Sequence, residues 1–187
     1  GAVLGGVVDR DIFSVALYVS PQQFRSKSFT DKVLAEIERW ELPRGLIELE
    51  VTEGLLIQDV DDTVAKMQTL REHGVRFSID DFGTGYSSLS YLKSLPLDTL
   101  KIDQSFVRDV LSDPDDANIV RAIVSMAQTL ELEVIAEGVE SEVIHQFLLE
   151  TGCQKFQGYL YAKPVPFPEF QRLLTQEQDL AVTGSVA

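Results

Sequence analysis

Two adjacent carboxylates, Asp80 and Asp81, follow a short run with β character that extends from Val75 to Ile79. Like charges at contact distance raise each other's pKa, so this pair is costly to hold together unless a cation lies between its members. A metal site at the end of a strand is therefore one interpretation of the pair. The other is a surface turn that caps the following helix, because aspartate is also a common turn residue.

Other polar side chains recur near the ends of the predicted strands. They are two acids, a lysine and an amide: Glu50, Glu137, Lys101 and Gln157. Each could be an ordinary surface charge or cap partner, but five consecutive strands place such a residue on the same side. Carboxylate oxygens without paired histidine or cysteine ligands favour Mg²⁺ or Mn²⁺ over zinc. Several acids and one lysine fit two-metal phosphoryl chemistry, in which the lysine orients or deprotonates a water molecule or balances charge.

Strand and helix patterns alternate along the chain. Six segments are predicted as strands: 14–20, 47–53, 75–79, 99–103, 133–138 and 155–159. Helices are predicted from residue 30 or 31 to 40, from an Asp61–Asp62 cap to 73, around 89–92, and at 119–130, 143–151 and 168–174. Strict β–α alternation predicts parallel strands joined by crossover helices in one domain.

The parity of the strand residues favours a barrel over an open doubly wound sheet. One side is apolar, where helices would cover it: Val15, Leu17, Val19, Ile47, Leu49, Val51, Leu100 and Ile102. The opposite side is persistently polar: Tyr18, Ser20, Glu48, Glu50, Thr52, Ser78, Asp80, Lys101, Asp103, Glu137 and Gln157. Helices cover both faces of a doubly wound sheet, which then read as apolar. A barrel can instead gather its polar residues around one mouth.

Composition limits the classes of partner. The chain has 187 residues and a formal net charge of −14, which argues against a nucleic-acid polymer or an anionic membrane as the main partner. Cys153 is the only cysteine, so no intrachain disulfide can form and a reducing, cytoplasmic compartment is expected. No apolar run approaches the roughly 20 residues that a membrane span needs.

Five short motifs together resemble the EAL-domain family. They are Glu-Val-Thr-Glu at 50–53, Asp-Asp-Phe-Gly-Thr-Gly at 80–85, Lys-Ile-Asp at 101–103, Ala-Glu-Gly-Val-Glu at 136–140 and Gln-Gly-Tyr at 157–159. The motifs stand in the family's order and spacing, and the resemblance extends from about Phe13 to Pro166. It implies a TIM-type (β/α)8 barrel that hydrolyses the bacterial messenger cyclic di-GMP to linear pGpG with two Mg²⁺ or Mn²⁺ ions.

The resemblance also implies roles for individual residues. The metal ligands would be Glu50, Asp80, Asp81 and Glu137, with Asp80 as the bridging ligand. The catalytic residues would be Lys101, Glu137, Asp81 and Gln157, with Lys101 acting on the attacking water. A lid after the aspartate pair would be supported by Glu53, Gly83, Thr84, Gly85 and Glu140. The substrate would contact Tyr18, Ser20, Pro21, Gln157 and Pro164.

Two departures from the family pattern bear on activity. The Glu-Ala-Leu motif that names the family is absent, so about six βα units are expected and one metal-ligand glutamate has no counterpart. Tyr18 stands where the family has a metal-binding asparagine. The domain is expected at 13–175, after a poorly matched or non-native segment at 1–12 and before a flexible tail at 176–187. A homodimer with flanking sensory or cyclase domains is expected.

These departures leave two functions open. The first is a cyclic di-GMP phosphodiesterase whose turnover is impaired by Tyr18 and the absent glutamate. The second is a receptor of the same fold that binds the messenger without hydrolysing it and passes the signal to a partner.

Overall fold

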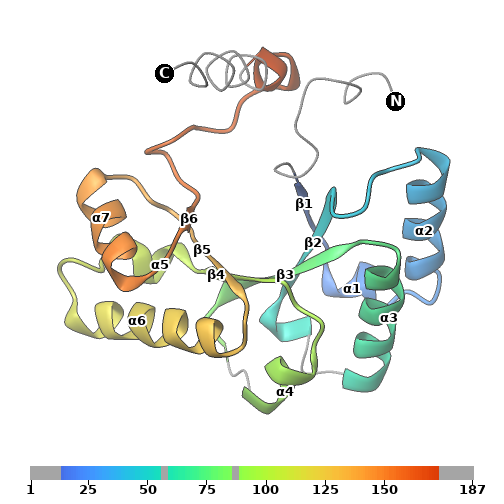
Figure 1. Cartoon of the computed structure of the whole chain (residues 1–187), viewed down its shortest axis with the longest axis horizontal. Helices are drawn as coiled ribbons and strands as arrows, with labels where there is room; N and C mark the ends of the chain where they lie inside the picture. Colours follow the sequence, from blue (N-terminus) through green and yellow to red (C-terminus); the bar gives the residue numbers. More distant parts are fainter. Residues whose placement is uncertain (1–13, 56–58, 86–88, 173–187) are drawn as a thin grey trace, which may run out of the picture.

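Six parallel strands form a curved half-barrel in the computed structural model, which describes residues 14–55, 59–85 and 89–172 (Figure 1). The strands are β1 (Val15–Tyr18), β2 (Ile47–Thr52), β3 (Arg76–Phe82), β4 (Thr99–Ile102), β5 (Glu133–Ala136) and β6 (Lys155–Phe156). They lie in the sheet in the order of the sequence, and each pairs in parallel with the next. The predicted parallel α/β architecture is confirmed.

Helices connect the strands within the described residues. They are α1 (Pro21–Phe24), α2 (Phe29–Arg39), α3 (Val60–Glu72), α4 (Leu89–Ser94), α5 (Gln104–Arg108), α6 (Pro114–Thr129) and α7 (Glu142–Thr151), with a 3₁₀ turn at Glu53–Leu55. Residues 167–172 are also helical. The predicted tail at 176–187 and most of the segment at 1–12 lie outside the described residues.

Several predicted helix boundaries were wrong, mostly at helix starts that are set by an N-cap residue. Asp59 occupies the N-cap position of α3, so Asp61 and Asp62 lie in its first turn instead of before it. α6 begins at Pro114, because Asp113 accepts a hydrogen bond from the N–H of Asp115 at 2.8 Å. The short elements α1, α5 and the 3₁₀ turn were not predicted, since one turn carries too few residues to show a period.

The hydrophobic core lies between the outer side of the sheet and the helices. Val51, Ile79, Leu100 and Ile102 are fully buried there. The helices contribute Met67 and Leu70 from α3, and Val120, Val124 and Ala127 from α6. The predicted apolar side of the strands is thus confirmed, and its burial fixes which side chains point the other way.

The inner side of the half-barrel is polar, as the parity predicted. Glu48, Ser78, Thr99 and Lys101 are all buried on it. A hollow of about 470 Å³ crosses the sheet on this side. Residues of all six strands line it, and β3 contributes Arg76, at its amino end. At its amino end, Glu133 pairs with Arg76 at 2.5 Å and with Lys155 at 2.9 Å. The strands therefore position charged groups at both ends of one hollow.

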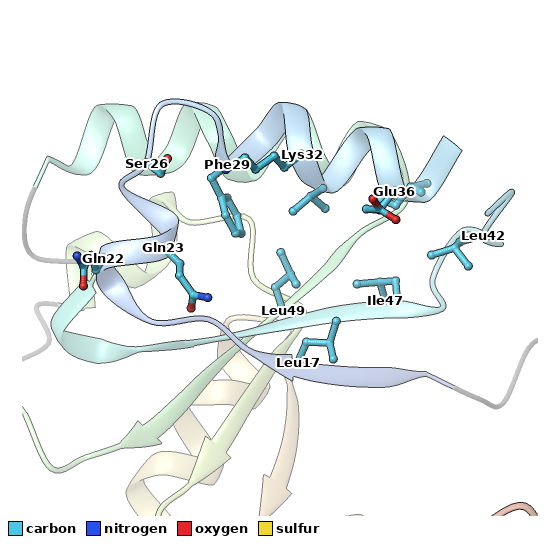
Figure 2. Close-up of a pocket in the computed structure, with 12 residues that line it drawn as sticks. Leu17, Gln22, Gln23, Ser26, Phe29, Lys32, Glu36, Leu42, Ile47 and Leu49 are labelled. Atoms are coloured by element: carbon cyan, nitrogen blue, oxygen red, sulfur yellow. The ribbon is translucent and has the colours of Figure 1, made fainter. Parts of the chain in front are cut away.

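The sheet has two open edges among the described residues, β1 and β6, as predicted. Beside β1, an apolar groove of about 610 Å³ lies between α2 and the first two strands (Figure 2). Leu17 on its floor is 45% exposed, and α2 has no fully buried side chain. No described helix has both the length and the apolar character needed to cross a membrane.

Candidate metal centre

Lys101 lies in the middle of the inner side of the sheet, on β4. Its side chain is 4% exposed, and its Nζ lies 2.7 Å from Glu50 Oε1, 2.9 Å from Asp80 Oδ1 and 2.7 Å from Glu137 Oε1. The three carboxylates come from β2, β3 and the residue after β5. An ammonium has three donor hydrogens, so these partners can occupy all of them.

Burial and charge act in opposite directions on Lys101. Burial alone would lower the pKa of Lys101, but hydrogen bonds to Glu137, Glu50 and Asp80 outweigh it and raise the pKa above its ordinary value. These contacts favour the charged ammonium form of Lys101. Burial raises the pKa of Glu137, and the ion pair with Lys101 offsets this increase only in part.

Asp81 completes a group of carboxylates that could hold a metal ion. One oxygen from each of Asp80, Asp81 and Glu137 lies within 4.8 Å of the other two. Hard oxygen donors without nitrogen or sulfur fit an Mg²⁺- or Mn²⁺-type ion. Asp81 has a left-handed backbone, with φ at 54°, and such strain in a residue other than glycine is concentrated at functional sites.

Asp81 is also coupled to Asp103, the N-cap of α5. Burial, the charge of Asp80 and a hydrogen bond with Asp103 all raise the pKa of Asp81. Burial would also raise the pKa of Asp103, but hydrogen bonds from the N–H and hydroxyl of Ser105 outweigh it and hold that pKa below its usual range. Of the two carboxyl groups, Asp81 is therefore the more readily protonated and Asp103 the stronger acid.

The loop after the aspartate pair is tied through Glu53 to the 3₁₀ turn that follows β2. The N–H of Gly85 donates to Glu53 Oε2 at 3.1 Å, and Glu53 is 5% exposed. A Cβ at Gly85 would lie 2.8 Å from Glu53 Cδ. Thr84 Oγ1 donates to the carbonyl of Asp81 at 2.9 Å, and Gly83 has φ at 101°, a conformation open mainly to glycine. Residues 86–88 of the predicted lid lie outside the described residues.

A sequence model of the EAL domain matches residues 7–164 of the chain. The chain belongs to the EAL-domain family. Among curated relatives, the cyclic di-GMP phosphodiesterase NbdA of Pseudomonas aeruginosa is 47% identical over 147 residues, covering 79% of this chain and 19% of NbdA. The signaling protein YkoW of Bacillus subtilis is 41% identical over 164 residues, covering 88% of this chain and 20% of YkoW. This EAL domain thus spans about a fifth of the length of these relatives.

Solved structures of EAL domains match the half-barrel. A phosphodiesterase in complex with cyclic di-GMP, PaMucR, is 42% identical with a TM-score of 0.82, covering 86% of this chain and 65% of that one. The EAL domain of Mycobacterium smegmatis DcpA is 45% identical with a TM-score of 0.83, covering 87% of this chain and 73% of that one. The TIM-barrel fold expected from the sequence is therefore confirmed at the level of family and architecture.

The other site residues that were predicted for this EAL domain lie around the carboxylate cluster. Tyr18 is in register with Glu50, and its side chain is 58% exposed. The hydroxyl of Ser20 caps α1 by accepting a hydrogen bond from the N–H of Gln23 at 3.3 Å, and Pro21 is the first residue of that helix. The cap therefore uses one acceptor site of the hydroxyl that the resemblance assigned to the substrate.

A second hollow, of about 770 Å³, lies beside Glu137. Gln157, Glu140 and Pro164 line it, together with Tyr159 and other residues of the segment after β6. The structure thus places three of the predicted catalytic, loop-support and substrate residues on one surface next to the carboxylates. Glu140 lies in this hollow, and no described contact connects it with the loop that follows Asp81.

Sequence reasoning missed two features of the site. Asp103 was placed on the polar side without a role, although its parity with Lys101, two residues earlier, is the signal that could have found it. Gly158 was noted only within a motif. A Cβ there would overlap the backbone N and O of Val139, so the segment after Glu137 packs directly on this glycine.

Proposed function

We propose that this EAL domain hydrolyses cyclic di-GMP to linear pGpG with Mg²⁺ or Mn²⁺ bound by Asp80, Asp81, Glu137 and Glu50. The convergence of these carboxylates on Lys101, on the inner side of the sheet, is the observation that supports the proposal. Relatives named as cyclic di-GMP phosphodiesterases, NbdA and PdeR, support the choice of substrate.

The charges of the groups at the site suit them to different roles in hydrolysis. Bound divalent ions supply polarisation of the phosphate and a water molecule of lowered pKa. Lys101 would orient the water or stabilise negative charge that develops on the phosphate. One of the partly buried carboxylates around Lys101 would accept the proton that the water releases. Water adds to phosphorus, the bond to the 3′ oxygen breaks, and a 5′ phosphate and a 3′ hydroxyl result.

A receptor without turnover is the second candidate, and Tyr18 favours it. A neutral phenol is a poor ligand for a hard cation, and its exposed ring beside Glu50 is available to stack on a guanine base. Incubation of the chain with cyclic di-GMP and Mn²⁺ separates the candidates. Linear dinucleotide as product would exclude the receptor, whereas saturable binding without product would exclude the enzyme.

The setting of the domain is inferred from its relatives. The bifunctional diguanylate cyclase/cyclic di-GMP phosphodiesterase MucR of P. aeruginosa is 43% identical over 162 residues, which cover 23% of that protein. We infer a cytoplasmic domain that works beside sensory or cyclase domains, as a homodimer. Chemical cross-linking of the purified chain would test the dimer.

Replacement of Tyr18 by asparagine should tighten Mn²⁺ binding about tenfold and raise turnover, because an amide oxygen beside Glu50 adds a hard ligand. Isothermal titration calorimetry and product formation measure the two effects. Tyr18→Phe is the matched control, since it removes only the hydroxyl and should leave metal affinity unchanged. Equal affinity in both variants would refute Tyr18 as a lost ligand.

Replacement of Glu53 by alanine should lower turnover roughly 10- to 100-fold, the usual cost of losing an outer partner of a metal site. The reason is that Glu53 holds the loop after Asp81 through Gly85. Glu48→Ala is the control, because Glu48 is an equally buried acid on β2, the strand just before Glu53, and it contacts Arg76 and not this loop. Similar losses in both variants would show that the effect is one of general stability.

A further inference from the structure

Two overlapping sets of carboxylates share the inner side of the half-barrel. Lys101 holds Glu50, Asp80 and Glu137, whereas the oxygens close enough to hold a metal ion come from Asp80, Asp81 and Glu137. Asp80 and Glu137 therefore belong to both sets. A divalent ion that binds to their oxygens would therefore lie close to the ammonium, and the two positive charges would repel each other.

The Lys101 ammonium also has no further donor hydrogen available in this arrangement. Its three donor hydrogens match the three acceptors at 2.7–2.9 Å, and its side chain is 4% exposed, so water cannot easily replace a partner that leaves. Without the ammonium, partly buried acids would face one another uncompensated, which is strongly unfavourable at low dielectric. The lysine thus supplies, from within the chain, the positive charge that a metal ion would otherwise supply.

We propose that Lys101 is the resident counter-cation of this carboxylate cluster, and that a divalent ion binds there by displacing the ammonium from Asp80 or Glu137. The proposal rests on the metal site of the proposed function and adds to it a role for Lys101 before substrate or metal arrives. The lysine stabilises the metal-free fold and at the same time weakens metal binding. A residue that only orients water would do neither.

Because Lys101 both stabilises the metal-free fold and weakens metal binding, one substitution should affect stability and metal affinity in opposite directions. Lys101→Met should lower the unfolding midpoint in EDTA by about 10 °C, because the cluster loses its compensating charge. The same variant should bind Mn²⁺ about tenfold more tightly, since the ion no longer displaces an ammonium. The rise in unfolding midpoint on adding Mn²⁺ should consequently be larger than in the wild-type chain.

The experiment compares the full chain with two further variants by calorimetry and thermal unfolding, with Mn²⁺ alone as the probe. Lys101→Arg keeps the charge and should restore most of the stability in EDTA. Lys155→Met is the matched control, because Lys155 lies on the same inner side and pairs with Glu133 at 2.9 Å, away from the metal-binding acids. It should leave Mn²⁺ affinity within about twofold of wild type.

A second measurement needs no substitution, in case Lys101→Met does not fold. Titration of the ¹⁵N-labelled wild-type chain with Mg²⁺ should weaken the protected ammonium signal of Lys101 in parallel with metal binding. If the signal stays unchanged while Mg²⁺ binds, the displacement is refuted.

The outcomes separate this proposal from the one on which it rests. If the wild-type chain binds Mn²⁺ and Lys101→Met binds it no more tightly, the counter-cation role is wrong and the metal site stands. If neither chain binds Mn²⁺, the proposed metal site and the displacement both fail. Tighter binding in Lys101→Met together with a lower midpoint in EDTA supports the role.

Discussion

Replacement of Asp80 by asparagine should reduce the hydrolysis of cyclic di-GMP by about 10³-fold or more, equivalent to roughly 4 kcal/mol of transition-state stabilisation. The Asp80 carboxylate contacts Lys101 at 2.9 Å and also belongs to the oxygens that could hold a metal ion. Asparagine keeps the size and shape of the side chain but removes its negative charge. Product formation at saturating Mn²⁺, with calorimetry of metal binding, measures the loss.

Asp98→Asn is the matched control for this substitution. Asp98 precedes β4, pairs with Arg71 at 3.2 Å, and its side chain is 19% exposed, close to the 16% of Asp80. It lies at the opposite end of the strand from the cluster, so turnover per folded molecule should stay near wild type. Activity of Asp80→Asn within tenfold of wild type would show that this carboxylate is not part of the reaction centre.

The sheet and the polar side of its strands could be predicted because both follow from a period of two. Once Leu49, Val51 and Ile79 are buried against helices, their neighbours must point inward, and this sets the direction of Glu50 and Asp80. The family motifs added which of those residues share a site. Neither source of information depends on the exact bounds of an element.

The features that escaped prediction depend on backbone conformation and close approach. The left-handed φ of Asp81 and its hydrogen bond with Asp103 are set by how β3 ends and how α5 begins. α5 has five residues, too few for a helical period to reveal it. The cap made by Ser20 likewise depends on α1, a helix of one turn. Sequence periodicity carries no information on such contacts.

Gly158 connects the fold to the site through one such contact, and Gly158→Ala should be among the most destabilising substitutions in the chain. A Cβ would overlap the backbone N and O of Val139 and lie 2.7 Å from its carbonyl carbon. Backbone atoms cannot turn aside as a flexible side chain can, and Val139 is further held by hydrogen bonds with Gln157 O at 3.1 Å and Leu160 N at 3.0 Å. We expect a loss of about 3 kcal/mol, or roughly 10 °C in unfolding midpoint.

The same substitution should weaken Mn²⁺ binding, because the displaced segment carries Glu137 only two residues before Val139. Gly54→Ala is the matched control: a Cβ there meets no atom within 4 Å, so both the midpoint and the metal affinity should change little. Thermal unfolding in EDTA and calorimetry with Mn²⁺ measure the two effects separately. Equal midpoints for the two variants would mean that the segment after Glu137 can move away from Gly158 freely, and that the close packing of these backbones does not hold the carboxylate in place.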